Sequence, residues 1–127
     1  MMTFYMNGII WRVEFVSPHS DLLVDRTGTM TVATTDPMTH MVYLSDSLEG
    51  EFLIHVLIHE LGHCILASYS LLDDIHRMCY PEKWIEMEEW VCNFLANYGW
   101  QVFTQAYSIL GMNALDILPG ELERLII

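Results

Sequence analysis

The sequence has few basic residues. Lys and Arg together number 5 among 127 residues, against 17 Asp and Glu, and the formal net charge is −12. A surface with this balance repels phosphate backbones and anionic lipid headgroups. The five basic residues also form no cluster that could offset the repulsion. We therefore expect neither direct nucleic-acid binding nor attachment to a membrane surface.

Neither a disulfide framework nor a targeting segment is expected from the sequence. Its three cysteines, Cys64, Cys79 and Cys92, form no CxxC pair, and an odd number favours free thiols in a reducing compartment. The first fifteen residues contain no basic segment followed by an apolar run, which argues against a signal peptide. We expect a cytoplasmic protein.

One apolar segment, residues 52–72, is long enough to span a bilayer. However, no second apolar span is present to shield its polar groups, and no Lys or Arg anchors flank it. We interpret this segment as the buried core helix of a soluble protein.

Repeats, low-complexity tracts and linkers are absent, so residues 1–127 are predicted to form a single domain. With 53% hydrophobic residues, the chain can bury a core of its own. Strand patterns come first and suggest two hairpins, separated by a looser segment, residues 17–28, with a short turn of helix. The hairpins are residues 3–6 with 9–16 around Asn7-Gly8, a favoured turn pair, and residues 29–35 with 40–45 around Asp36-Pro37.

Helical patterns follow the strands. Asp46 with Glu49 resembles a capping box, and Ser47 is a rival cap. From there to about Ser70, apolar residues occur all round the predicted helix, as expected of a central buried helix. Residues 70–80 are predicted to be a loop or an irregular connector.

A second long helix is predicted to begin at Pro81, which suits the first helical position. It runs to at least Tyr98, and to Ile109 if Gly99 is tolerated. Residues 113–127 suggest one more short helical piece. Strands followed by helices indicate an α+β fold, with a small antiparallel sheet from the two hairpins packed on the central helix and on the second helix.

The central helix contains His59-Glu60-Leu61-Gly62-His63, which matches H-E-x-x-H. Helical residues four apart share a face and are about 6 Å apart along the axis, so both imidazoles can bind one Zn²⁺. Glu60 points to one side of the pair and can accept a proton from a water activated by the metal. Such polar groups are costly to bury without a cation. The pattern therefore predicts a zinc site with Glu60 as general base.

Gly62 within this motif costs helix stability, about 1 kcal/mol relative to Ala. Close approach of a strand or a substrate would account for it, and so would a plain packing constraint.

A third ligand is needed, because a catalytic zinc site usually takes three protein ligands and leaves one position open. Glu86, Glu88 and Glu89 on the second helix are the candidates. Glu88 and Glu89 both lie along an apolar stripe of that helix, so periodicity alone does not separate them, whereas Glu86 lies off the stripe and is expected in solvent. The alternative is that all three form a charged, solvated helix face. The stripe consists of Ile85, Val91, Cys92, Leu95 and Ala96.

Other polar residues near the motif have weaker signals. His55 lies one turn before His59, and a hydrogen-bonded helix histidine is favoured there over a substrate-facing group. His76, Tyr69 and Tyr80 lie in or near the predicted connector. One of these three is a candidate donor to a developing oxyanion, although each is an ordinary loop residue by default.

Together, HELGH and residues 89–96, EWVCNFLA, resemble the ImmA/IrrE-type minimal zinc metallopeptidases. That family pairs H-E-x-x-H with a downstream E-x-x-A-N-x-F-A helix whose leading Glu is the third ligand. The resemblance implies that Glu89, not Glu88, binds the metal. Residues 34–48 resemble the family's strand-turn-strand segment, which implies that residues 42–44 form an edge strand for a peptide substrate.

The resemblance implies a cytoplasmic, minimal zincin-like endopeptidase of the gluzincin type, of the kind common in phages and mobile elements. His59, His63 and Glu89 would hold Zn²⁺, Glu60 would be the base, and the substrate would be a protein or peptide, such as a regulatory protein of the phage or mobile element.

Two alternatives stay open. The first is a non-catalytic module in which the metal only stabilises the fold or a binding groove, as a fourth ligand such as His76 would indicate. The second is a homo-oligomeric phage structural or regulatory protein, with which the 9 Met and 4 Trp are compatible.

Overall fold

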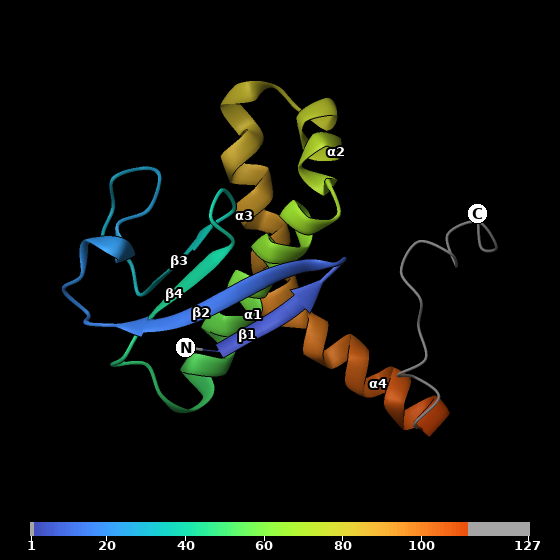
Figure 1. The fold of residues 1–127 in the computed structure, drawn as a ribbon. Coiled ribbons are helices and arrows are strands. Elements are labelled where there is room, and N and C mark those ends of the chain that lie inside the picture. The colour runs from blue at the N-terminus through green and yellow to red at the C-terminus, as the bar shows by residue number, and fades with distance from the viewer. Residues whose placement is uncertain (1, 112–127) are drawn as a thin grey trace. The chain divides into compact units, whose positions relative to one another are not determined.

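The computed structural model of this protein describes residues 2–111 (Figure 1). The chain divides into two compact units, Met1–Asn97 and Tyr98–Ile127, and each is described by itself. The expectation of a single domain stays a prediction. The helical piece predicted within residues 113–127 lies outside the described residues.

The first unit contains a four-stranded sheet in the order β1-β2-β4-β3. Both predicted hairpins are confirmed, because β1 pairs antiparallel with β2 and β3 pairs antiparallel with β4. Asn7 and Gly8 have φ angles of 52° and 75°, as the two-residue Asn-Gly turn requires. The strands are β1 (Met2–Met6), β2 (Ile9–Val16), β3 (Ala33–Asp36) and β4 (Met41–Ser45).

The α+β class is confirmed, but the sheet is mixed rather than wholly antiparallel, because β2 and β4 pair in parallel. The chain between them is long enough to return to the same end of the sheet before β4 begins, and it contains β3. This order also corrects the predicted edge strand. Residues 42–44 lie in β4, which is flanked on both sides, and the edge strands of the sheet are β1 and β3.

The helices follow the sheet, as predicted (Figure 1). The second helix is confirmed in part: Pro81 starts a 3-10 turn, the α-helix begins at Trp84, and residues 95–99 are π-helical, with ordinary helical angles at Gly99. The helices are α1 (Gly50–Ser68), α2 (Leu71–Met78), α3 (Trp84–Phe94) and α4 (Trp100–Leu110); shorter turns are η1 (Asp21–Leu23), η2 (Pro81–Lys83) and the π-helical η3 (Leu95–Gly99).

Two local predictions are wrong. The predicted loop at residues 70–80 contains α2, because Ile75, Leu71 and Leu72 recur at helical spacing and pack against the other helices. The capping box is absent, since α1 begins at Gly50 after Glu49, whose side chain makes no cap.

Helix α1 is the central element of the first unit. One side of it packs on the sheet in a cluster that includes Trp11, Val42 and Cys64. A second cluster, in which Leu66 contacts Ile75 and Cys92, joins it to α2 and α3. Its C-terminal end is attached to the first hairpin, because Ser68 Oγ accepts a hydrogen bond from Trp11 Nε1 at 2.8 Å and Ser68 O accepts one from Asn7 Nδ2 at 2.9 Å.

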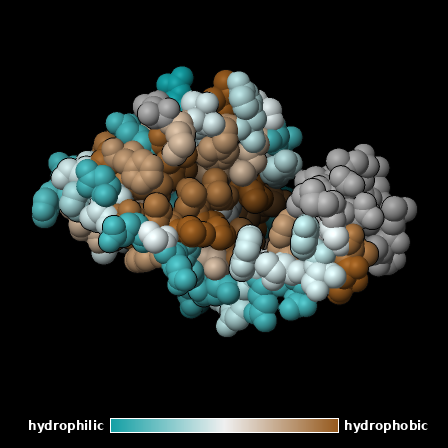
Figure 2. Space-filling model, turned by 90° about the horizontal axis from the view of Figure 1, so that it is seen from below, coloured by the Kyte–Doolittle hydropathy of each residue, from teal (hydrophilic) through white to brown (hydrophobic). Residues whose placement is uncertain are grey.

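Among the described helices, α1 is the one whose length and apolar composition would suffice to cross a membrane, a test that core helices of soluble proteins also pass. Some of its apolar side chains are exposed, with Phe52 at 53% and Ile54 at 59%. Figure 2, which views the molecule from below, shows apolar side chains gathered over the middle of that face. The cytoplasmic localisation stays a prediction.

Candidate metal centre

The structure brings together the three residues predicted as metal ligands. His59 and His63 lie one turn apart on α1, with their Nε2 atoms 3.2 Å apart. Glu89 of α3 faces both, with Oε2 at 3.1 Å from His59 Nε2 and Oε1 at 3.3 Å from His63 Nε2. One ligand atom from each residue lies within 4.8 Å of the others. Two imidazoles and a carboxylate are a common donor set for a divalent metal, so this group could hold a metal ion.

Close packing of α1 on α3 creates this arrangement. A Cβ atom added at Gly62 would lie 3.2 Å from Cys92 Sγ and 3.4 Å from Cys92 Cα. The two helices therefore meet at the glycine of the motif, and Glu89, one turn before Cys92, faces the histidines. A packing constraint thus accounts for Gly62, and the approach of a strand does not.

The two adjacent glutamates, which periodicity could not separate, have different roles. The carboxylate of Glu89 contacts the Nε2 atoms of His59 and His63. In contrast, Oε2 of Glu88 lies 3.2 Å from Nδ1 of His63. The Glu88 side chain is 8% exposed and also pairs with Arg26. Because a metal-binding histidine usually donates its other N–H to an acceptor that fixes the ring, Glu88 is placed to orient His63. Glu86 is exposed and pairs with Lys83, as expected.

The negative charges of Glu88 and Glu89 favour a positive charge close to them. Hydrogen bonds with His59 and then His63 hold the pKa of Glu89 well below its usual value. Burial acts to raise the pKa of Glu88, but hydrogen bonds with His63 and Arg26 lower it overall. Burial acts to lower the pKa of His63, but hydrogen bonds with Cys92 and both glutamates raise it to about 12. Without a metal, a proton on His63 balances the carboxylates, and a cation that binds there replaces this proton.

Glu60 lies beside the ligand group without joining it. Its side chain is buried, at 6% exposure, and its Oε2 accepts a hydrogen bond from Thr35 Oγ1 at 2.5 Å. Thr35 lies on β3, and sequence reasoning missed it. The signal available was the period of two along the strand, which places Thr35 on the same face as the buried Ala33.

Two cavities flank the site. The larger, about 500 Å³, lies beside His63 and both glutamates and is also lined by Arg26. The smaller, about 340 Å³, lies beside His59 and is lined by apolar side chains such as Phe52 and by His55. Glu60 lines both cavities. His55 thus lines a cavity, and its role as a substrate-facing group or a hydrogen-bonded helix histidine stays a prediction.

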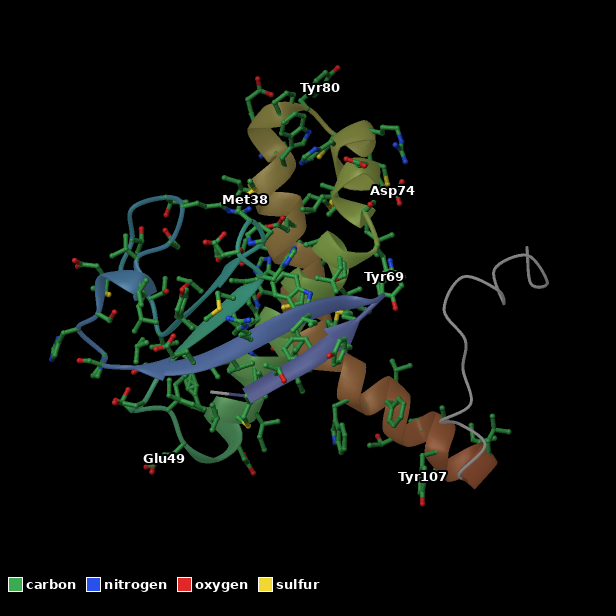
Figure 3. The ribbon with its side chains drawn as sticks, viewed as in Figure 1. Met38, Glu49, Tyr69, Asp74, Tyr80 and Tyr107 are labelled. Atoms are coloured by element: carbon green, nitrogen blue, oxygen red, sulfur yellow. The ribbon has the colours of Figure 1, made fainter. Side chains whose placement is uncertain are left out.

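None of the three predicted transition-state donors lines either cavity. His76 stacks on Trp84 with ring centroids 4.0 Å apart. Tyr80 is 81% exposed, and Figure 3 shows it at the outer end of α2 and α3, pointing away from the sheet. Tyr69 follows the last residue of α1. Arg26, which sequence reasoning missed, lines the larger cavity instead, and no local pattern in the sequence marks it.

The cysteines are free, as expected. Cys64 and Cys92 are fully buried close to the site. Burial, followed by the charges of Glu60 and Cys92, raises the pKa of Cys64 to about 12, and burial raises the pKa of Cys92. Neither thiol belongs to the group of potential ligand atoms found among residues 2–111.

Comparison with known proteins adds no family to these observations. No family model matches this sequence, and no curated protein matches it. The resemblance to the ImmA/IrrE-type metallopeptidases therefore stays a prediction based on HELGH and residues 89–96.

Proposed function

We propose that this protein is a zinc-dependent metallopeptidase of the gluzincin type that hydrolyses peptide bonds of a protein substrate. One observation carries the proposal: His59, His63 and Glu89 converge beside an open cavity, which Glu60 also lines without joining the group. Within residues 2–111 no further His, Cys, Asp or Glu joins the group. Three ligands with an open position are typical of catalytic zinc sites.

The donor set supports zinc as the metal. Two imidazole nitrogens and one carboxylate oxygen suit Zn²⁺. The contact between Glu88 and His63 Nδ1 resembles the carboxylate–histidine–zinc arrangement that orients ligands in many zinc sites. We expect purified protein to contain close to one zinc ion per chain.

The bound ion would supply Lewis acidity, polarising the substrate carbonyl and acidifying the attacking water. Glu60 would accept the proton of that water and pass it to the leaving amine. The hydrogen bond from Thr35 to Oε2 would hold this carboxylate in place. The edge strand β3, which supplies Ala33, Thr34 and Thr35 to the larger cavity, would pair with an extended peptide.

The test is the substitution Glu60→Gln, with Glu51→Gln as a matched control at an exposed position of the same helix. We expect Glu60→Gln to retain zinc, measured by elemental analysis, and to lose turnover of a peptide library by about 10²–10⁴-fold, the usual contribution of a general base. Glu51→Gln should match the wild type. Undiminished cleavage by Glu60→Gln would disprove this mechanism.

A non-catalytic, metal-stabilised module is the second candidate. The low exposure of Glu60, 6%, favours it, because a carboxylate shielded in this way has less access to water. Zinc-loaded protein that cleaves no peptide, but loses thermal stability when a chelator removes the metal, would support this alternative.

A regulatory protein of a phage or mobile element is the substrate that the family resemblance implies for the first candidate.

A further inference from the structure

Arg26 lies at the metal centre without being one of its ligands. It belongs to the loop between η1 and β3, pairs with the buried Glu88, and has Nη2 at 3.6 Å from Oε1 of Glu89. Its side chain is 47% exposed and lines the larger cavity. Among residues 2–111 it is the one Lys or Arg that lines either cavity, so this single cation faces the space where a substrate would lie.

Arg26 is held in place from two directions. The turn that carries it is closed by Asp25, whose Oδ1 accepts hydrogen bonds from the backbone N–H groups of Thr27 at 2.8 Å and Thr29 at 3.0 Å. Gly28 provides the positive φ of this turn, 84°. At the other end, Glu88 holds the guanidinium. A donor fixed in this way loses little freedom when a ligand binds.

The guanidinium of Arg26 has N–H groups besides those at Nη2, the atom that pairs with Glu88. It carries five N–H groups in a planar fork, and its pair with Glu88 runs through Nη2. Arg26 and Glu89 line the same larger cavity, so a substrate held there by a metal on Glu89 would lie within reach of the guanidinium. Negative charge develops there on the carbonyl oxygen when a peptide bond is attacked, and one such donor typically contributes about 10²–10³-fold in kcat.

We propose that Arg26 is the anion-binding arm of this metal centre, which donates hydrogen bonds to the substrate oxygen as negative charge develops on it. The assignment to an oxyanion rests on the proposed peptidase function, whereas the binding of an anion does not. Arg26 would thus take the role that the sequence had suggested for His76, Tyr69 or Tyr80. A purely structural role, in which Arg26 only neutralises Glu88, is the competing explanation.

Anion binding can be measured without turnover. The full chain is loaded with Co²⁺, and inorganic phosphate, a tetrahedral anion, is titrated while visible absorption of the metal is recorded. We expect Arg26→Ala to weaken phosphate binding at least about 10-fold and Arg26→Lys to recover part of this loss. Arg77→Ala is the matched control, since Arg77 is an exposed arginine paired with Asp74, and it should bind phosphate like the wild type.

Metal affinity separates the two explanations. Removal of a cation 3.6 Å from Glu89 should leave Co²⁺ affinity unchanged or raise it, whereas loss of support for Glu88 should lower it. Unchanged phosphate binding by Arg26→Ala would overturn the proposal, with or without a loss of Co²⁺ affinity.

Cleavage assays then distinguish the proposed role of Arg26 from the proposed peptidase function. With zinc bound, Arg26→Ala should lower kcat about 10²–10³-fold and change KM little. Wild-type turnover with an undiminished rate in Arg26→Ala would refute the oxyanion assignment and leave the peptidase function intact. Absence of wild-type turnover, together with phosphate binding that depends on Arg26, would refute the peptidase function and support the anion-binding arm.

Discussion

The two histidines of HELGH have different surroundings. His63 is held at Nδ1 by Glu88 and hydrogen-bonded by Cys92, and it borders the larger cavity, which contains charged groups. For His59 the described contacts run through Nε2, to His63 and Glu89, and it borders the smaller cavity with Phe52 and Val56. The imidazole of His63 is thus held by neighbouring side chains, whereas the imidazole of His59 borders a mostly apolar cavity.

This difference shows that the motif, although symmetric in its ligands, sits in an asymmetric site. The charged side can contact a polar or anionic part of a ligand through Arg26, and the apolar side can accept an apolar group. Substitutions on the two sides should therefore have unequal effects on metal affinity.

The largest effect is expected at Glu89, which contacts both histidines. Glu89→Ala should lose most of the metal affinity, because it removes the third donor and leaves two imidazoles alone. Competition with a chromogenic chelator measures this loss, and Glu86→Ala, an exposed neighbour on the same helix, is the control. A greater loss in Glu88→Ala would mean that the third ligand is assigned to the wrong glutamate.

A smaller effect is expected at Glu88. Removal of a residue that orients a ligand typically costs about 10–100-fold in metal affinity, so Glu88→Ala should fall in that range in the same competition assay. Asn93→Ala, on the His59 side, should change metal affinity little. Equal losses in the two variants would contradict the asymmetry.

The smallest effect concerns the helix contact itself. Gly62→Ala places a Cβ 3.2 Å from Cys92 Sγ; overpacking costs about 1–3 kcal/mol, and the better helix propensity of alanine returns about 1 kcal/mol. We expect the metal-free variant to lose about 1 kcal/mol in the free energy of unfolding, measured by urea denaturation. The loss should shrink in a Cys92→Ala background, since that change removes the sulfur atom. A stabilised Gly62→Ala variant would show that the two helices can separate freely.

The parts predicted correctly from sequence depend on local geometry. The spacing within HELGH fixes His59 and His63 on one face of any helix, and Asn7-Gly8 specifies its own turn. The group of His59, His63 and Glu89 was also predicted, although Glu89 came from the family resemblance and not from periodicity. The structure gives the physical reason: adjacent residues of α3 reach different nitrogen atoms of the same imidazole.

The parts missed depend on contacts between distant segments. Helix α2 is short, and short helices owe most of their stability to tertiary packing rather than to their own sequence. The parallel pairing of β2 with β4 follows from the course of a long connection, which local patterns do not specify. Arg26 lies 62 residues from its partner Glu88, so no spacing rule could place it in the site.

The attachment of Ser68 to the first hairpin has a consequence for the order of folding during synthesis. Trp11 and Asn7 precede their partner by 57 and 61 residues, and an isolated two-stranded hairpin is marginally stable in water. The first hairpin is synthesised before α1, so it gains these two hydrogen bonds only after the last residue of α1 has been made. Until then Trp11, which is fully buried in the folded protein, lacks the side-chain acceptor of its indole N–H.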